Sequence, residues 1–402
     1  MSSAGKFASQ LRSADLSRRI IHAMSRVDAV SKNQKWRKET IGYRDSEGNA
    51  DAFAIDGHSS VVVDLVSVQG MPQIEYWNIS GSDNPSVPSK TVRHRVRGLE
   101  PHTWDSANWA DFNLFKESHK QFLGRFSGFV AAHPSSFAAL YEEFEKPVLM
   151  NISTRYEHPF STNPAGWDLL DDSLRAMFDK KLLFPVANNV GDQEYFTAQT
   201  GIPCEYAPSL CSYVGKRSPE VITGTAIFSN NPWLTKFLEE ETKGRWIDRK
   251  KILPGHYSWG NLASLEGAFV VPYNSSTMTV FELAALGVPI VIPSLKFLQK
   301  LQSQFGYGVM DQVSFANLRG KKVSKERSSY LQGMTDLEWW FQKSDFLKSP
   351  LVSNLVTVVE SLDDLKEVLL TRPNPESIEV AYSKVHSLRE SAYSKFISSI
   401  RV

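Results

Sequence analysis

Short apolar runs alternate with amphipathic stretches along most of the chain, and this rhythm is most regular after residue 125. Short apolar runs are typical of buried parallel strands, whereas apolar positions three and four residues apart indicate helices. In the first half the pattern predicts strands over 61–66, 74–79, 126–132, 148–153 and 182–187, and helices over 112–122, 134–144, 167–181 and 192–200. This alternation predicts a parallel sheet covered by helices on both faces.

The alternation of strands and helices is interrupted at 213–224, which contains the run Gly-Lys-Arg-Ser-Pro, and a second α/β series begins after it. Strands are expected over 225–229, 251–253, 268–271, 288–292 and 355–359, and helices over 232–242, 275–286, 297–305 and 361–370. A last helix should start at Pro375, with Asn374 as its N-cap. We therefore expect one domain over 1–212, a second over 213–372 and a final helix over 373–402.

Composition narrows the class of protein. The 402 residues are 42% hydrophobic and 22% charged, as in ordinary folded proteins, and the net charge of +1 gives no global electrostatic case for nucleic acid or a membrane surface. Two cysteines make neither a disulfide framework nor a metal pattern. No apolar run is long enough to span a bilayer. The expectation is a cytoplasmic protein, although the Arg- and Ser-containing first thirty residues leave a transit peptide open beside a plain surface helix.

The segment 268–294 is the most informative stretch. It reads as a buried strand, a turn of Pro272, Tyr273 and Asn274, a helix to about Leu286, and a second buried strand beyond Gly287. The turn lies at the carboxyl end of the first strand, where open α/β sheets bind ligands. Hydroxyls and free amides at the following helix N-terminus are suited to a phosphate group.

This unit resembles the donor site of GT-B glycosyltransferases, which are built from two facing Rossmann-like domains. Their signature is a Glu followed by Ala-x-Ala-x-Gly-x-Pro, and Glu282-Leu-Ala-Ala-Leu-Gly-Val-Pro289 matches it at the Glu, the second Ala, the Gly and the Pro. The resemblance implies that Glu282 holds the ribose of a nucleotide-sugar, that Asn274, Ser275, Ser276 and Thr277 lie at the donor's diphosphate and sugar, and that the final helix crosses back to the first domain. Many relatives carry an acid eight residues before the Glu, where this chain has Asn274, so retaining and inverting transfer both stay open.

In the first half, four polar clusters follow predicted strands, which places them at the expected cleft: Trp77-Asn78, His133–Ser136, Thr154–His158 and Asn188-Asn189. An inverting transfer needs a general base, for which His133, Glu157 and His158 are candidates. Arg155 would orient Glu157 or pair with donor phosphate, and a structural ion pair of Arg155 and Glu157 is the alternative. His133 is equally compatible with a helix cap or a core position.

Departure of a nucleoside diphosphate requires charge neutralisation. No Asp-x-Asp follows a strand, so we expect no metal or cofactor and assign the task to Lys243 and Arg245, for which a charged loop is the alternative. His256 and Tyr257 follow a predicted strand where GT-B enzymes face the nucleotide base. The basic loop 320–327 reads as solvated or as a contact for an anionic acceptor.

The sequence thus predicts a metal-independent GT-B glycosyltransferase that moves a hexosyl or deoxyhexosyl group from a nucleoside-diphosphate sugar to a glycan or other hydroxyl acceptor. Two alternatives remain: a sugar-nucleotide epimerase or hydrolase, and a non-catalytic nucleotide- or sugar-binding protein of the same fold. The sequence has no Gly-x-Ser-x-Gly motif of serine hydrolases, no Gly-x-x-x-x-Gly-Lys motif of P-loop ATPases and no strand-linked Gly-x-Gly-x-x-Gly motif of nicotinamide enzymes. The oligomeric state is left open.

Overall fold

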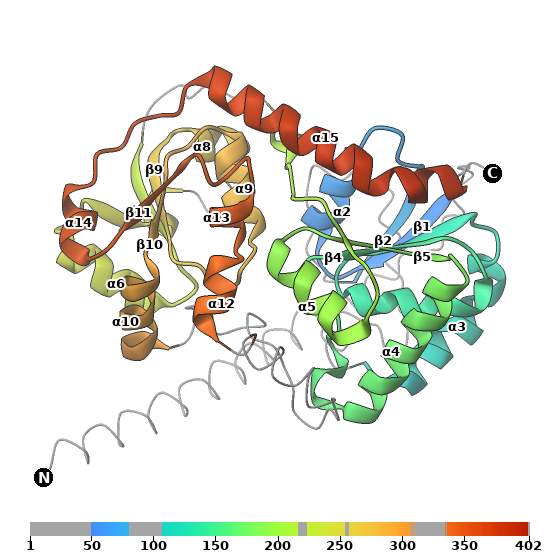
Figure 1. Ribbon diagram of the computed structural model, residues 1–402. Coiled ribbons are helices and arrows are strands. Elements are labelled where there is room, and N and C mark those ends of the chain that lie inside the picture. Colours follow the sequence, from blue (N-terminus) through green and yellow to red (C-terminus); the bar gives the residue numbers. More distant parts are fainter. Residues whose placement is uncertain are drawn as a thin grey trace, which may run out of the picture.

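The chain forms two α/β domains that lie side by side and are spanned by one long C-terminal helix (Figure 1). The computed structural model describes residues 50–79, 107–215, 223–253, 257–306, 310, 334 and 336–400, without the side chains of Ser59, Asn78 and Thr162. The expected N-terminal helix and the basic loop 320–327 lie outside the described residues. Among the described helices, none has both the length and the apolar character needed to cross a membrane.

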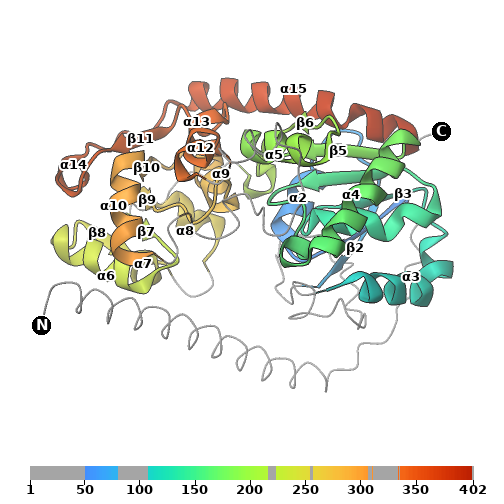
Figure 2. The same ribbon diagram turned by 60° about the horizontal axis from the view of Figure 1, so that its bottom comes forward.

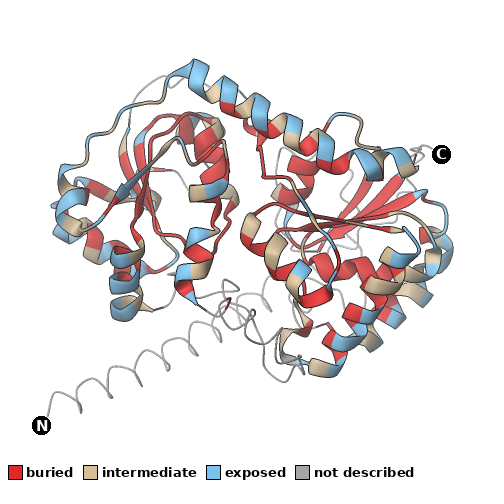
Figure 3. Cartoon of the chain, viewed as in Figure 1, coloured by how far each residue is buried: buried red, intermediate tan, exposed pale blue. Residues whose placement is uncertain are grey.

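The first domain is built on a six-stranded parallel sheet with the order β2-β1-β3-β4-β5-β6. Its strands are β1 Ala52–Asp56, β2 Ile74–Asn78, β3 Gly128–Ala131, β4 Val148–Ile152, β5 Leu183–Ala187 and β6 Glu205–Tyr206. The helices are α2 Ser59–Val66, α3 Trp109–Leu123, α4 Pro164–Asp179 and α5 Val190–Thr200, with 3₁₀ segments η2 Ser135–Phe144, η3 Phe160–Thr162 and η4 Ser212–Val214. The central strands are buried because helices cover both faces (Figure 3).

The second domain repeats the plan with a five-stranded parallel sheet in the order β11-β10-β9-β7-β8. Its strands are β7 Gly224–Phe228, β8 Trp246–Asp248, β9 Leu265–Val270, β10 Ile290–Pro293 and β11 Val356–Val359. Its helices are α6 Pro232–Glu241, α7 Arg249–Ile252, α8 Trp259–Ala263, α9 Met278–Ala285, α10 Leu295–Phe305, α12 Leu337–Gln342, α13 Asp345–Lys348 and α14 Leu362–Glu367. The prediction of two parallel α/β, Rossmann-like domains is confirmed.

The final helix, α15 Pro375–Ile400, leaves the second domain and packs along the first (Figure 2). Asn374 caps it as predicted, since its Oδ1 accepts a hydrogen bond from the backbone N–H of Glu376 at 3.0 Å. Tyr393 and Phe396 are buried in the core of the first domain, and the Tyr393 hydroxyl donates to Asn151 Oδ1 at 3.0 Å. The expected return of the last helix to the first domain is confirmed.

Two strand predictions were wrong. The run 61–66 lies in helix α2, where three consecutive valines and Leu65 are all buried. A short apolar run of this kind does not distinguish a buried strand from a buried helix. Residues 249–252 form helix α7, and the edge strand is β8, immediately before it. The first strand of the sheet, β1, was not predicted.

A buried ion pair fixes the joint between the domains. Arg389 of α15 donates from Nη1 to Asp64 Oδ2 at 2.5 Å and from Nη2 to the Asp64 carbonyl at 2.7 Å. Asp64 Oδ1 also accepts the backbone N–H of Cys211 at 2.7 Å, and Arg389 reaches the Pro208 carbonyl at 3.1 Å. Helix α2, α15 and the linker segment 208–215, which follows β6, therefore meet at this ion pair.

Candidate functional site

A cleft lies between the two domains, where the carboxyl ends of their strands face each other. In each sheet the winding reverses between the first and third strands, β1 and β3 in one domain and β7 and β9 in the other. Doubly wound sheets bind ligands at this switch point. A cavity of about 240 Å³ is formed there by His58, Val61, His133, Ser153, Thr154, His158 and Asn188 of the first domain and Tyr273, Asn274, Ser276, Thr277 and Met278 of the second.

Histidines dominate the wall supplied by the first domain. His58 follows β1 and His133 follows β3, and their ring centroids lie 5.9 Å apart. His158 follows β4, with its ring 6.5 Å from that of His133. Burial lowers the pKa of His133 to about 3, with a further lowering from His58 and His158, so its imidazole is neutral at physiological pH. A neutral imidazole has a lone pair that can accept a proton from a hydroxyl group, and a pKa this low makes His133 a weak base until a bound substrate raises it.

The carboxylate of Asp56 connects these histidine loops. Asp56 is fully buried at the end of β1, and its two oxygens accept the backbone N–H groups of His58 and His133, the latter at 2.6 Å. Burial raises its pKa well above the ordinary value, against the effect of those hydrogen bonds. The loops after β1 and β3 are therefore held together by one side chain, and their histidines keep a fixed spacing.

The second domain contributes the loop after β9 and the start of α9. Asn274 Oδ1 accepts the backbone N–H of Ser275 at 2.8 Å, and the Ser275 carbonyl accepts the backbone N–H of Asp345 at 3.1 Å. Thr277 is the N-cap of α9, but its side chain makes no capping bond, and its buried Oγ1 has no hydrogen-bond partner in the described part of the chain. An uncapped helix N-terminus beside hydroxyl groups is a site for an anion.

Glu282 lies one turn into α9, only 7% exposed, and its Oε1 accepts a hydrogen bond from the Tyr213 hydroxyl at 2.6 Å. Burial raises the pKa of Glu282, while the bond from Tyr213 acts in the opposite direction. Burial also raises the pKa of Tyr257 and of Tyr273; Arg249 opposes this rise and Glu282 adds to it, so both tyrosines lie within electrostatic range of these two charges. Aromatic rings, a carboxylate and a guanidinium thus surround the same corner of the second domain.

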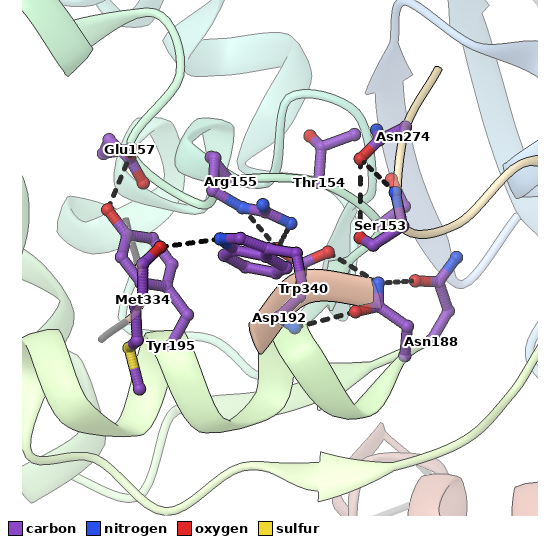
Figure 4. Close-up of polar contacts among 12 residues, drawn as sticks. Ser153, Thr154, Arg155, Glu157, Asn188, Asp192, Tyr195, Asn274, Met334 and Trp340 are labelled. Atoms are coloured by element: carbon purple, nitrogen blue, oxygen red, sulfur yellow. Dashed lines mark hydrogen bonds and ion pairs between the residues drawn. The ribbon is translucent and has the colours of Figure 1, made fainter. Parts of the chain in front are cut away.

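Arg155 and Glu157 are not among the residues that line the described cavity. Their side chains contact Asp192 and Tyr195 instead (Figure 4). Arg155 is 2% exposed, donates from Nε to Asp192 Oδ1 at 2.7 Å, and stacks at 3.5 Å over the ring of Trp340. Glu157 is fully buried and accepts the Tyr195 hydroxyl at 3.1 Å; burial raises its pKa to about 7. Arg155 therefore pairs with Asp192, in place of the Arg155–Glu157 ion pair that the sequence left open.

The two basic residues expected at the donor phosphates are also elsewhere. Lys243 and Arg245 precede β8, so they lie at the amino edge of the sheet, whereas the cleft is at the carboxyl edge. Arg245 donates to the backbone carbonyls of Lys366 and Val368. His256 lies outside the described residues, and Tyr257 borders the corner near Glu282.

Sequence reasoning missed His58 because the strand before it was not recognised. The signal was present, since the apolar run of β1 ends at Asp56 and is followed by Gly57 and His58, a polar step at the carboxyl end of a strand. In contrast, His133, Thr154, His158 and Asn188 were placed correctly at strand ends, and the structure brings them to one cavity. Within the described ranges, no group of His, Cys, Asp and Glu is arranged to hold a metal ion.

Comparison with known proteins gives no relative by sequence: no protein-family model matches the chain, and no curated protein is significantly similar. Several solved structures match the chain, including the two that follow. The glycotransferase of kitacinnamycin has 8% identity over 88% of this chain and 98% of its own, with a TM-score of 0.38. UGT2 of Phytolacca americana, complexed with UDP-2-fluoroglucose and pterostilbene, has 11% identity over 86% of this chain and 95% of its own, with a TM-score of 0.37.

Proposed function

We propose that the chain is a glycosyltransferase that moves a sugar from a nucleoside-diphosphate donor to a hydroxyl acceptor in the interdomain cleft. One observation supports this proposal most strongly: the switch points of the two sheets face each other across one cavity. The N-terminus of α9 lies on one wall of that cavity, and the neutral imidazole of His133 lies on the other. An anion-binding site opposite a proton acceptor suits a reaction in which a diphosphate leaves while a hydroxyl group attacks.

The donor would bind to the second domain. The amides at the start of α9 and the hydroxyls of Ser275, Ser276 and Thr277 would hold the diphosphate. Glu282 would accept hydrogen bonds from the ribose, and the partly exposed ring of Tyr257 would stack on the base. The GT-B resemblance of 282–289 supports these assignments. Lys243 and Arg245 have no part in this proposal, because they lie at the other edge of the sheet.

The acceptor would approach from the first domain. His133 and His58 are the two candidates for the general base, since both are set at the switch point by Asp56. A glycan or another polar hydroxyl compound fits the described wall, which is made mostly of histidine, serine, threonine and asparagine. Glu157 is withdrawn as a candidate base because it is fully buried away from the cavity.

A thermal-shift panel tests the donor assignment. A nucleoside diphosphate or its sugar at a hundred times its dissociation constant should stabilise the fold by about 2.7 kcal/mol. The shift should be lost in Glu282→Ala. Sugar transfer to a hydroxyl acceptor would support the proposal, whereas donor breakdown by water alone would favour a hydrolase, and binding without turnover of any donor would favour a non-catalytic protein.

A further inference from the structure

The linker between the domains touches the proposed ribose-binding carboxylate. Tyr213 lies in η4, seven residues beyond the last strand of the first sheet, and its hydroxyl donates to Glu282 Oε1 on α9 at 2.6 Å. The ring of Tyr213 is half-buried and packs against Trp259, with ring centroids 5.6 Å apart. This is a direct polar connection between the hinge segment and the donor half of the cleft.

The linker itself is held firmly on the side of the first domain. Asp64 accepts the backbone N–H groups of Leu210 and Cys211, and Arg389 completes the cluster from α15. Cys211 adopts a left-handed backbone conformation with φ of 52°, which an L-residue adopts only when its surroundings enforce it. The chain therefore enters η4 at a fixed angle, and the position of the Tyr213 hydroxyl is set by the first domain.

We infer that Tyr213 is a positioning residue that orients Glu282 for the nucleotide and ties donor binding to the interdomain linker. The inference rests on the proposed function, because it assigns a partner to the residue that would hold the ribose. Tyr213 occupies Oε1 only, and in the described part of the chain Oε2 of Glu282 accepts no hydrogen bond. One oxygen thus fixes the carboxylate, and the other is available to a ribose hydroxyl.

The same bond affects the charge state of Glu282. A donor to a carboxylate favours its ionised form, whereas burial and the nearby Asp64 of α2 favour the protonated form. Arg249 of α7 and the tyrosines at 257 and 273 face the same corner, and Cys211 approaches from the linker. Removing the Tyr213 hydroxyl should therefore raise the pKa of Glu282 further, so nucleotide binding should be lost at a higher pH on acidification.

Calorimetric titration of the full chain tests this with UDP, GDP, ADP and CDP, using whichever binds most tightly. Glu282→Gln should weaken that nucleotide about tenfold or more, and Tyr213→Phe about three- to tenfold, as expected for a hydrogen bond to a charged group. In Tyr213→Phe the midpoint of the pH dependence should also move upward. The control is Tyr382→Phe, which removes a partly buried hydroxyl near Ser212 in the same linker that makes no hydrogen bond to Glu282, and it should stay within twofold of the wild type.

Failure of the donor site and failure of the Tyr213 role give different results. If no nucleotide binds the wild-type chain, or Glu282→Gln binds normally, the proposed donor site is wrong and the inference falls with it. If Glu282→Gln is weakened but Tyr213→Phe matches Tyr382→Phe in affinity and pH midpoint, only the role of Tyr213 is overturned.

Hydrogen–deuterium exchange on the wild-type chain tests the coupling between nucleotide binding and the linker independently, and it does not require that Tyr213→Phe folds. Nucleotide binding should slow exchange in the linker segment 208–215 as well as in 278–286. Protection confined to 278–286 would contradict the coupling.

Discussion

Arg389 and Asp64, which are 325 residues apart in the chain, form an ion pair in which both side chains are at most 5% exposed. The pair joins α15 to α2 beside the linker, so it holds together the two places where the chain crosses between the domains. Removal of one partner leaves a buried charge alone, which costs far more than the loss of a surface pair.

We therefore predict that Arg389→Ala lowers the free energy of unfolding by about 3–5 kcal/mol, measured by urea denaturation. The matched control is Lys180→Ala, which breaks an exposed ion pair with Glu145 and should change stability by less than about 1 kcal/mol. Similar effects for the two variants would show that the buried pair does not stabilise the joint.

Trp340 is a second point of contact between the domains. It is fully buried, stacks on Arg155 of the first domain, and donates from Nε1 to the Met334 carbonyl at 2.7 Å. Trp340→Ala should lower the free energy of unfolding by about 3–5 kcal/mol, as for other buried aromatic residues. Trp233→Ala is the control, because that ring is 70% exposed and its loss should change stability by no more than about 0.5 kcal/mol. Equal unfolding midpoints in the two variants would contradict the packing described for α12.

Glu157 should make stability depend on pH in a defined direction. Burial raises its pKa from 4.5 to about 7, so between these values the folded chain binds more protons than the unfolded chain. Stability then falls as pH rises through this window, by about 3 kcal/mol for the full shift, and is insensitive to Glu157 below it. Glu157→Gln removes this contribution and keeps an acceptor for Tyr195.

The variant should gain about 3 kcal/mol relative to the wild type between pH 4.5 and pH 7.5, measured by denaturation at each pH. Glu145→Gln, at an exposed position, should show no such trend. A difference between Glu157→Gln and the wild type that is constant across the range would mean that Glu157 is ionised without penalty.

The histidine wall is tested by the kinetics of transfer. If His133 is the general base, His133→Gln should lower kcat by about 10²- to 10⁴-fold and leave the affinity for the nucleotide unchanged. His119→Gln is the control, because this ring stacks on Phe115 outside the cleft. Full activity in His133→Gln together with a loss in His58→Gln would transfer the role to His58, and full activity in both would exclude a histidine base.

The parts of the fold that the sequence predicted well are those with local signals. The unit from β9 to β10 follows from two buried apolar runs and from Gly287, whose φ of 67° is the left-handed conformation that ends helix α9. The start of α15 follows from Asn374 and Pro375 in the same way. These signals lie within a few residues of the structure that they determine.

The wrong predictions concern relationships set by distant residues. The valines of α2 have a high strand propensity, but this segment is helical in the fold, where α2 packs against the linker and α15. Nothing near Arg155 in sequence indicates that its partner is Asp192, 37 residues later, or that Trp340 covers it. The site was therefore predictable as a set of strand ends, whereas the pairing of the charged residues around it was not.

The central claim is that a nucleoside diphosphate binds where the loop 274–277 turns into α9. A crystal structure of the full chain soaked with the tightest-binding nucleoside diphosphate tests it most directly. We predict diphosphate oxygens within hydrogen-bonding distance of the first amides of α9 and the Thr277 hydroxyl, with the ribose beside Glu282 and the cavity open toward His133. A nucleotide bound elsewhere, for example in the charged groove lined by Lys236, Lys243 and Lys251, with the interdomain cavity empty, would contradict the account.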